Sequence, residues 1–173
     1  MWARTYPSAK YGFVGQLTVP RYVSVENGKL LQKPVIFGKL TEKTRVFEKY
    51  KGNLLIGTLV LEVENLNELS LELRKGDGEL TKFYLDGKDF VFDRSSSGEK
   101  IEGLEKDELS FKGIRKMPYL KKDKDVIYVV VDKYSVEIFV NGISMSNVIY
   151  PKESSDGLEI ELKAKTAYLS IYK

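Results

Sequence analysis

Two pairs of glutamates come closest to the pattern of an active site in this chain. Glu62 and Glu64 alternate along one predicted strand, and Glu159 and Glu161 along another. Residues two apart share one face of a strand and lie about 7 Å from each other. Catalysis by a carboxyl pair needs a separation of about 5 Å and one raised pKa. Because both pairs occupy the polar half of an alternating pattern, we predict solvated surface carboxylates without a catalytic role.

The composition removes most other catalytic chemistries. The sequence contains no histidine and no cysteine, so it lacks the usual serine and cysteine triads, the ordinary zinc ligands and the most common general base. It offers neither disulfides nor thiol chemistry. The sequence also shows no glycine-rich phosphate loop and no acidic cluster with metal-ligand spacing. We therefore predict no catalytic residue, no metal site and no cofactor.

Charge and hydropathy are those of an ordinary globular domain. The 173 residues carry 28 Lys and Arg against 25 Asp and Glu, a net charge of +3, which is too small to indicate a nucleic-acid partner. The lysines at 116–124 are interleaved with Asp123 and Asp125, as in a solvated loop. No stretch of 18 apolar residues suits a membrane span, and residues 1–20 lack the pattern of a signal peptide. We expect one domain, located in the cytoplasm.

The elements that position these residues are predicted to be short strands almost throughout. Residues 69–74 alternate leucine with polar side chains, which predicts a strand with leucines on one face and polar groups on the other. About twelve strands separated by turn dipeptides indicate an all-β fold, a two-sheet antiparallel β-sandwich. The predicted strands are residues 22–25, 30–37, 59–64, 69–74, 80–85, 90–92, 111–114, 126–131, 136–140, 145–150, 158–162 and 167–172.

Turn signals recur between these strands. Asn141-Gly142 offers the positive-φ residues of a tight hairpin turn. Residues 95–106 are rich in Ser, Gly, Glu and Lys, which predicts a mobile loop, with a candidate helical turn at 102–109. The other predicted turns are Asn27-Gly28, Lys51-Gly52, Gly76-Asp77-Gly78, Asp86-Gly87 and Asp156-Gly157.

Three motifs occur in order along the chain. Residues 15–21 read GQLTVPR, residues 93–98 read DRSSSG, and residues 132–141 read DKYSVEIFVN. Together they resemble the motifs G-x-[ML]-[ST]-[ILV]-P-R, D-R-S-x-S-G and D-x-S-S-V-E-[IV]-F-[VI]-N of the C-terminal domain of glycoside hydrolase family 32, the invertases, sucrose-6-phosphate hydrolases and fructanases. The resemblance covers essentially the whole chain. One departure is Tyr134, which stands where the family usually has serine.

The resemblance implies a fold and a domain boundary. The family's C-terminal domain consists of two antiparallel sheets of about six strands, a lectin-like (concanavalin-like jelly roll) sandwich, which we expect at residues 15–173. Residues 1–14 are expected to be the remnant of a propeller end and a linker, and Trp2-Ala3 and Pro7 match loosely the run that ends the family's last catalytic blade. In a detached domain these residues would either be disordered or lie across the sandwich surface.

The resemblance also implies a function. Family members hydrolyse β-fructofuranosides with a five-bladed propeller that precedes this region, and its N-D-P-N-G, R-D-P and E-C motifs do not occur in these 173 residues. The chain is therefore expected to be a non-catalytic sandwich that supports the catalytic propeller of a β-fructofuranosidase acting on sucrose, sucrose-6-phosphate or a fructan. By itself the chain is not expected to be an enzyme. Apolar surface left by the missing propeller predicts self-association.

The motif residues are expected to have structural roles. Glu137 is predicted to hold the hairpin, or to meet the propeller, through a hydrogen bond or ion pair. Asp132 is expected to support the turn at Lys133-Tyr134. The remaining motif residues are candidates for turn anchoring, ion pairing, strand initiation or contact with the missing domain: Pro20, Arg21, Asp93, Arg94 and Asn141.

Two further functions stay open. A free-standing carbohydrate-binding module with the lectin-like fold would need an aromatic platform, but tyrosine is also a common strand residue, so no sugar-binding residue is assigned. The chain could also be one half of a split glycosidase whose propeller is encoded separately. The tyrosines that could contribute to a platform are Tyr119, Tyr128, Tyr134, Tyr150, Tyr168 and Tyr172.

Overall fold

The computed structural model describes residues 7–13, 15–101 and 113–173. These residues form one short 3-10 helix, η1 (Pro7–Tyr11), and fourteen strands. None of their helices is long and apolar enough to cross a membrane. Trp2, Ala3 and the candidate helical turn at 102–109 lie outside the described residues.

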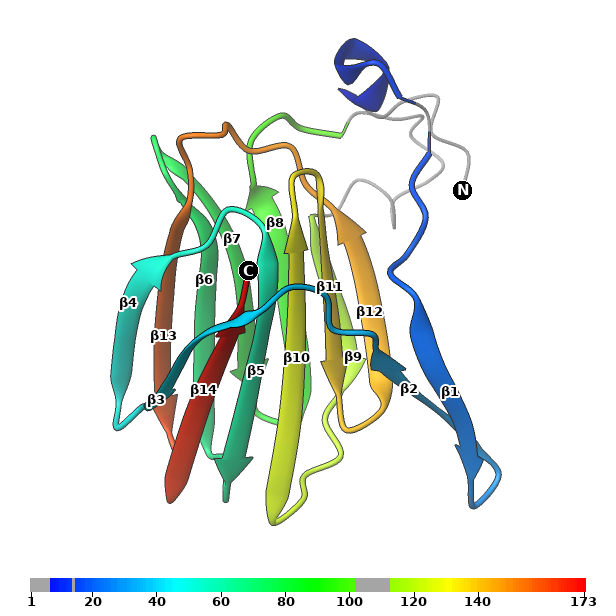
Figure 1. The fold of residues 1–173 in the computed structure, drawn as a ribbon, viewed down its shortest axis with the longest axis vertical. Helices are drawn as coiled ribbons and strands as arrows, with labels where there is room; N and C mark the ends of the chain where they lie inside the picture. The colour runs from blue at the N-terminus through cyan, green and yellow to red at the C-terminus, as the bar shows by residue number, and fades with distance from the viewer. Residues whose placement is uncertain (1–6, 14, 102–112) are drawn as a thin grey trace.

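Twelve of the strands form two six-stranded antiparallel sheets that lie face to face (Figure 1). The first sheet has the order β12-β11-β10-β5-β14-β3. Its strands are β3 (Leu40–Arg45), β5 (Gly57–Glu64), β10 (Lys124–Asp132), β11 (Ser135–Val140), β12 (Ile143–Val148) and β14 (Thr166–Tyr172).

The second sheet has the order β4-β13-β6-β7-β8-β9. Consecutive strands pair through tight turns along β6, β7 and β8, whereas β13 comes from the far end of the sequence and inserts between β4 and β6. Its strands are β4 (Lys49–Asn53), β6 (Glu68–Gly76), β7 (Glu79–Asp86), β8 (Asp89–Ser96), β9 (Ile114–Pro118) and β13 (Gly157–Lys163).

The core fills the space between the two sheets because alternate side chains of a strand point to opposite faces of its sheet. Along β10 every second residue is buried, with Ile127, Val129 and Val131 facing inward. Phe83 and Phe90 stack across the second sheet with ring centroids 4.9 Å apart. Burial of each such side chain contributes about 1.5–3 kcal/mol to folding. The predicted sandwich is confirmed.

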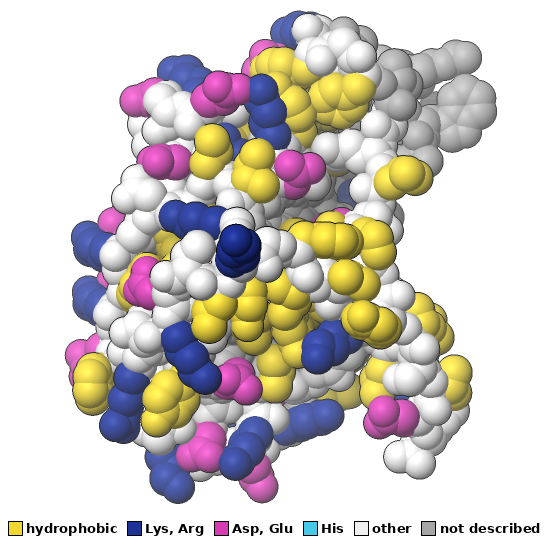
Figure 2. Space-filling model, viewed as in Figure 1, with side chains coloured by type: hydrophobic (Ala, Val, Ile, Leu, Met, Phe, Trp, Pro, Cys, Tyr) yellow, Lys and Arg dark blue, Asp and Glu magenta, His cyan; other side chains and the backbone are white. Residues whose placement is uncertain are grey.

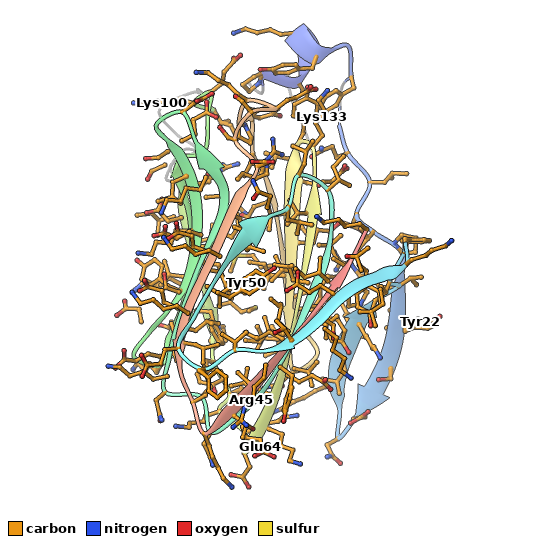
Figure 3. All side chains as sticks on the ribbon, turned by 60° about the vertical axis from the view of Figure 1, so that its left-hand side comes forward. Tyr22, Arg45, Tyr50, Glu64, Lys100 and Lys133 are labelled. Atoms are coloured by element: carbon orange, nitrogen blue, oxygen red, sulfur yellow. The ribbon has the colours of Figure 1, made fainter. Side chains whose placement is uncertain are left out.

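A separate hairpin of β1 (Arg21–Glu26) and β2 (Lys29–Pro34) packs beside the outer face of the first sheet, near β10, β11 and β12. The Gln32 amide donates to the Gly142 carbonyl at 2.8 Å. Much of this hairpin is exposed, and Figure 3 shows Tyr22 on its outer side. Figure 2 shows apolar side chains gathered over the hairpin and the chain that follows it. The exposed apolar residues there are Tyr22, Val23, Val25, Leu30, Phe37 and Leu40.

Three local predictions were wrong. Strands β3 and β4 were not predicted, and Lys51-Gly52 lies inside β4 rather than in a turn. Both are edge strands: β3 is rich in Thr, Lys and Glu, and β4 carries two lysines, a composition that protects an edge but hides the strand pattern. The loop predicted from residue 95 begins too early, because β8 extends to Ser96 and Ser97 is buried.

Candidate functional site

The first and third motifs meet on the outer face of the first sheet. Val136, Ile138 and Val140 of β11 point into the core, so the alternation turns Glu137 and Phe139 to the opposite face. Arg21, at the start of β1, places its Nη2 atom 2.6 Å from Glu137 Oε2. Its guanidinium also lies over the Phe139 ring, 5.0 Å from the centroid. A contact between distant segments therefore fixes the beginning of the hairpin.

Both oxygens of the Glu137 carboxylate are engaged. Oε1 accepts a hydrogen bond from the Val19 amide at 2.7 Å, and Oε2 accepts one from Ser146 Oγ at 2.8 Å in addition to Arg21. Arg21 Nη1 donates to Gln32 Oε1 at 2.6 Å and to Ser144 Oγ at 3.1 Å. Glu137 is 3% exposed. Buried charges need such partners. Arg21 Nε alone of the guanidinium nitrogens has no partner among the described residues, and the other contacts hold residues 19–21 against the sheet.

The second motif, residues 93–98, connects β8 of the second sheet to β12 of the first sheet. Asp93 Oδ1 accepts hydrogen bonds from the Ser95 amide at 2.8 Å and from Ser95 Oγ at 2.6 Å, which orders the end of β8. Arg94 is nearly buried and donates from Nη1 to the Val148 carbonyl of β12 at 2.9 Å. Ser97 Oγ donates to the Leu80 carbonyl at 3.1 Å.

The remaining motif residues lie at turns. Asp132 Oδ1 accepts from the Lys133 amide at 2.7 Å. Asn141 adopts a φ of 50° in the hairpin turn, a conformation that asparagine tolerates better than most residues. Its side chain accepts from the Val126 amide at 3.2 Å and donates to Asp125 Oδ1 at 2.6 Å. The Pro20 carbonyl accepts from the Val35 amide at 2.9 Å.

Arg74 is a central residue that the pattern of β6 did not reveal. Alternation predicts it on the polar face, but the strand has a bulge after Leu73 and Arg74 has a φ of 50°. Its side chain is fully buried. The guanidinium donates to the carbonyls of Ser155, Lys133 and Lys152 at 2.7, 3.0 and 2.9 Å. Burial lowers the pKa of Arg74.

Three of the four paired glutamates, Glu64, Glu159 and Glu161, lie in ion pairs at the surface. Glu159 contacts Lys51 and Lys75 at 3.1 and 3.0 Å, and Glu161 contacts Lys49 at 2.8 Å. These lysines lower the pKa of both carboxyls. In the other pair, Lys124 lowers the pKa of Glu64. A lowered pKa is the opposite of what a general acid requires at neutral pH.

The aromatic residues that the structure describes lie in several places and do not form one platform. Tyr134 and Tyr150 pack with Tyr11 and Phe13 at one end of the sandwich, where centroid distances run from 4.8 to 5.9 Å. Lys133, in the turn beside this cluster, is labelled in Figure 3.

The other four predicted platform tyrosines lie elsewhere. Tyr119 packs on Phe90 and donates to Asp125, and Tyr128 lies beneath Lys33. Tyr168 and Tyr172 lie on β14.

A pocket opens beside the Arg21–Glu137 contact. Residues 15–18 cover it, β11 and β12 form one wall, and Arg115 of β9 reaches it from the second sheet. Phe13 and Tyr150 supply apolar surface. No group of three or more acidic, histidine or cysteine residues suited to a metal ion occurs in the described parts of the chain.

These features define a class, the two-sheet antiparallel β-sandwich. The family profile described as "Glycosyl hydrolases family 32 C terminal" matches residues 29–172. The chain belongs to this family, and the predicted resemblance is confirmed.

Two curated relatives are sucrose-6-phosphate hydrolases. The one from Staphylococcus xylosus is 26% identical over 184 residues, covering 97% of this chain and 36% of the relative. The one from Zymomonas mobilis is 26% identical over 181 residues, covering 90% and 33%. The chain thus spans about a third of the length of the curated relatives it matches, and corresponds to the C-terminal domain.

Solved structures share the fold. Sucrose-6-phosphate hydrolase from Lactobacillus gasseri aligns with a TM-score of 0.70 at 17% identity, covering 88% of this chain and 33% of that one. Exo-inulinase from Aspergillus awamori aligns with a TM-score of 0.63 at 18% identity, covering 90% and 35%. These similarities establish the architecture of the domain.

Proposed function

We propose that this chain serves as the non-catalytic β-sandwich of a β-fructofuranosidase and stabilises a catalytic propeller that precedes it. The Arg21–Glu137 contact carries the proposal. A 2.6 Å ion pair attaches Arg21, the residue that follows 15–20, to β11 of the first sheet. A domain that precedes residue 15 would therefore be held in a defined orientation. Polar contacts that are nearly buried position elements more reliably than exposed ones.

The match to sucrose-6-phosphate hydrolases supports a substrate class. Two relatives with this printed name each match through about a third of their length. We therefore propose sucrose-6-phosphate or a related β-fructofuranoside as the substrate of the complete protein. The ion-paired glutamates of this domain have no part in that reaction.

Fructose release tests the non-catalytic assignment. The purified chain at high concentration is expected to release no fructose from sucrose, sucrose-6-phosphate or inulin above a buffer control. The assignment would be refuted if the chain released fructose and the Glu159→Gln or Glu64→Gln substitution abolished that release. Calorimetry with sucrose and inulin separates a supporting domain, which gives no heat of binding with these unphosphorylated sugars, from a carbohydrate-binding module.

A domain exchange tests the supporting role. This chain replaces the matched C-terminal third of the Staphylococcus xylosus relative, and thermal unfolding is compared with that of the truncated relative. The chimaera is expected to melt at a higher temperature than the truncated relative. A chimaera that carries Glu137→Gln in this chain is expected to show a smaller increase. A positive control carries the relative's own C-terminal third. Stabilisation by that control alone would count against the proposal.

A further inference from the structure

The pocket beside residues 15–18 lies where the open edges of the two sheets meet. β12 is the edge strand of the first sheet, and β9 is the edge strand of the second. The cavity has a volume of about 100 Å³. A water molecule needs roughly 10–15 Å³ of such space, so the cavity has room for several waters or for a phosphate-sized group.

Polar side chains occupy inward-facing positions at this edge. Arg115 precedes the core residue Met117 by two positions on β9, and Asn147 follows Met145, which packs against the core, by two positions on β12. Residues two apart share a strand face. Arginine and asparagine therefore stand at positions where the rest of each strand carries apolar side chains.

Several polar atoms of the pocket lining are buried without a partner. Asn147 is 5% exposed, and neither its Nδ2 nor its Oδ1 atom has a hydrogen-bond partner among the described residues. The same holds for Arg115 Nε and for Oγ of the buried Ser8. A buried polar group left unpaired costs about 1–3 kcal/mol, and native proteins leave few of them. These four atoms belong to three residues that line one cavity, and a ligand bound there would supply their partners.

The charge of the lining favours an anion. The acidic residue that borders the cavity, Glu137, is already neutralised by Arg21 at 2.6 Å. Arg115 makes no ion pair with an acidic residue in the described ranges. Its Nε–H, the Asn147 Nδ2–H and the Ser8 hydroxyl are donors, which suits an oxyanion with several acceptor oxygens.

The Asn147 carbonyl oxygen adds a second requirement. This unpartnered acceptor needs a donor such as a hydroxyl group. Phe13 and Tyr150 offer apolar surface beside it, which suits the C–H face of a small ring. An oxyanion that carries hydroxyl groups satisfies both requirements together.

We propose that this pocket binds the phosphate monoester of a small hydroxylated molecule such as a monosaccharide. Ser8, Arg115 and Asn147 would donate to the phosphate, and Asn147 Oδ1 would accept from a ligand hydroxyl. The proposed role is binding of this ligand without its transformation. This proposal does not depend on the function proposed above.

Titration calorimetry of the full chain tests the site with three probes: fructose 6-phosphate, inorganic phosphate and fructose. Fructose 6-phosphate is expected to bind more tightly than phosphate, fructose to give no heat, and added NaCl to weaken binding. The Arg115→Gln and Asn147→Leu variants are each expected to lose about ten- to a hundredfold in affinity. Arg45→Gln, an exposed change on β3, is the matched control.

Several results would overturn the proposal. The proposal fails if fructose 6-phosphate does not bind, or if fructose or inorganic phosphate binds as tightly as fructose 6-phosphate. It also fails if the Arg115→Gln variant binds fructose 6-phosphate as tightly as the Arg45→Gln control does. Because Asn147 is buried, its variant is first checked for a cooperative melt. If that variant does not fold, the half-exposed Arg115 decides the outcome.

Discussion

Replacement of Arg74 by methionine is the most direct test of how this sandwich is held together. The side chain is fully buried, and its closest hydrogen-bond acceptors are the carbonyls of Lys133, Lys152 and Ser155. Lys133 lies in the turn between β10 and β11, and the other two lie in the loop before β13. One guanidinium thus connects the β10–β11 turn of the first sheet to the loop that leads into β13 of the second sheet. Methionine keeps much of the volume and removes all three donors.

The magnitude follows from the groups left behind. The Ser155 carbonyl is left unpaired at a buried site, at a cost of about 1–3 kcal/mol, and the Lys133 and Lys152 carbonyls at part-buried sites, where water replaces part of the bond, at about 0.5–1.5 kcal/mol each. Removal of a buried charge returns part of this loss, because the guanidinium no longer has to be desolvated. We expect a net loss of about 2–4 kcal/mol in the free energy of unfolding. For a domain of this size each kcal/mol lowers the melting temperature by about 2–4 °C, which gives a fall of roughly 4–16 °C.

Thermal and urea unfolding, followed by circular dichroism, measure this loss. Arg45→Met is the matched control, since Arg45 is exposed on β3 and stacks over Phe47 at 4.9 Å. Its loss is expected to stay within about 1 kcal/mol. Arg74→Lys keeps the charge but not the planar fork, so its stability should fall between those of the wild type and Arg74→Met. Equal losses for Arg74→Met and Arg45→Met would refute the reasoning.

Four further predictions follow from the same structure. In a double-mutant cycle, Arg21→Met and Glu137→Gln should show a coupling of about 1–3 kcal/mol in urea unfolding, and a coupling near zero would contradict the ion-pair role. The pKa values of Glu64, Glu99, Glu153, Glu159 and Glu161 lie below the usual 4.5 because of their lysine partners. The stability that they contribute is therefore present above pH 4.5 and is lost as the pH falls through the lower folded values, and acid titrations should show a shallower loss in 1 M NaCl. Hydrogen bonding to Glu99 raises the pKa of Tyr11 from 10.0 to about 12; ultraviolet titration should show the Glu99→Gln variant returning it toward 10, and no shift would argue against this contact. The exposed apolar residues of the β1–β2 hairpin, including Val23 and Val25, predict self-association in sizing with light scattering, and a monomer at high concentration that Val25→Thr leaves unchanged would count against it.

Much of the architecture could be predicted because alternation reports directly on which side of a strand is buried. Residues 136–140 are the clearest case. Their pattern placed Glu137 opposite the core, and the structure has Val136, Ile138 and Val140 inside with Glu137 outside. Asn141-Gly142 likewise occupies the predicted hairpin turn. Local sequence was sufficient here because the face of a strand residue and the type of a tight turn both depend on neighbouring residues.

The partners of these residues could not be predicted in the same way. Nothing within residues 136–140 indicates that Arg21 would be the cation beside Glu137, because that contact spans much of the chain. Arg74 was misplaced because a bulge reverses the strand face, and the pattern up to Leu73 gives no sign of it. The unpartnered Asn147 was equally hidden, since its burial depends on β9 and on residues 15–18.

The position of β14 has a consequence for how the domain is made. This last strand of the sequence lies between β3 and β5, both of which a ribosome would produce much earlier. Until Thr166–Tyr172 has emerged, β5 (Gly57–Glu64), whose middle residues Leu59, Val60 and Leu61 are apolar, has no neighbour on that side. Unpaired edges of this kind invite association with other chains, and pairings between distant segments form slowly. Nascent chains should therefore need protection by chaperones until synthesis of the domain is nearly complete.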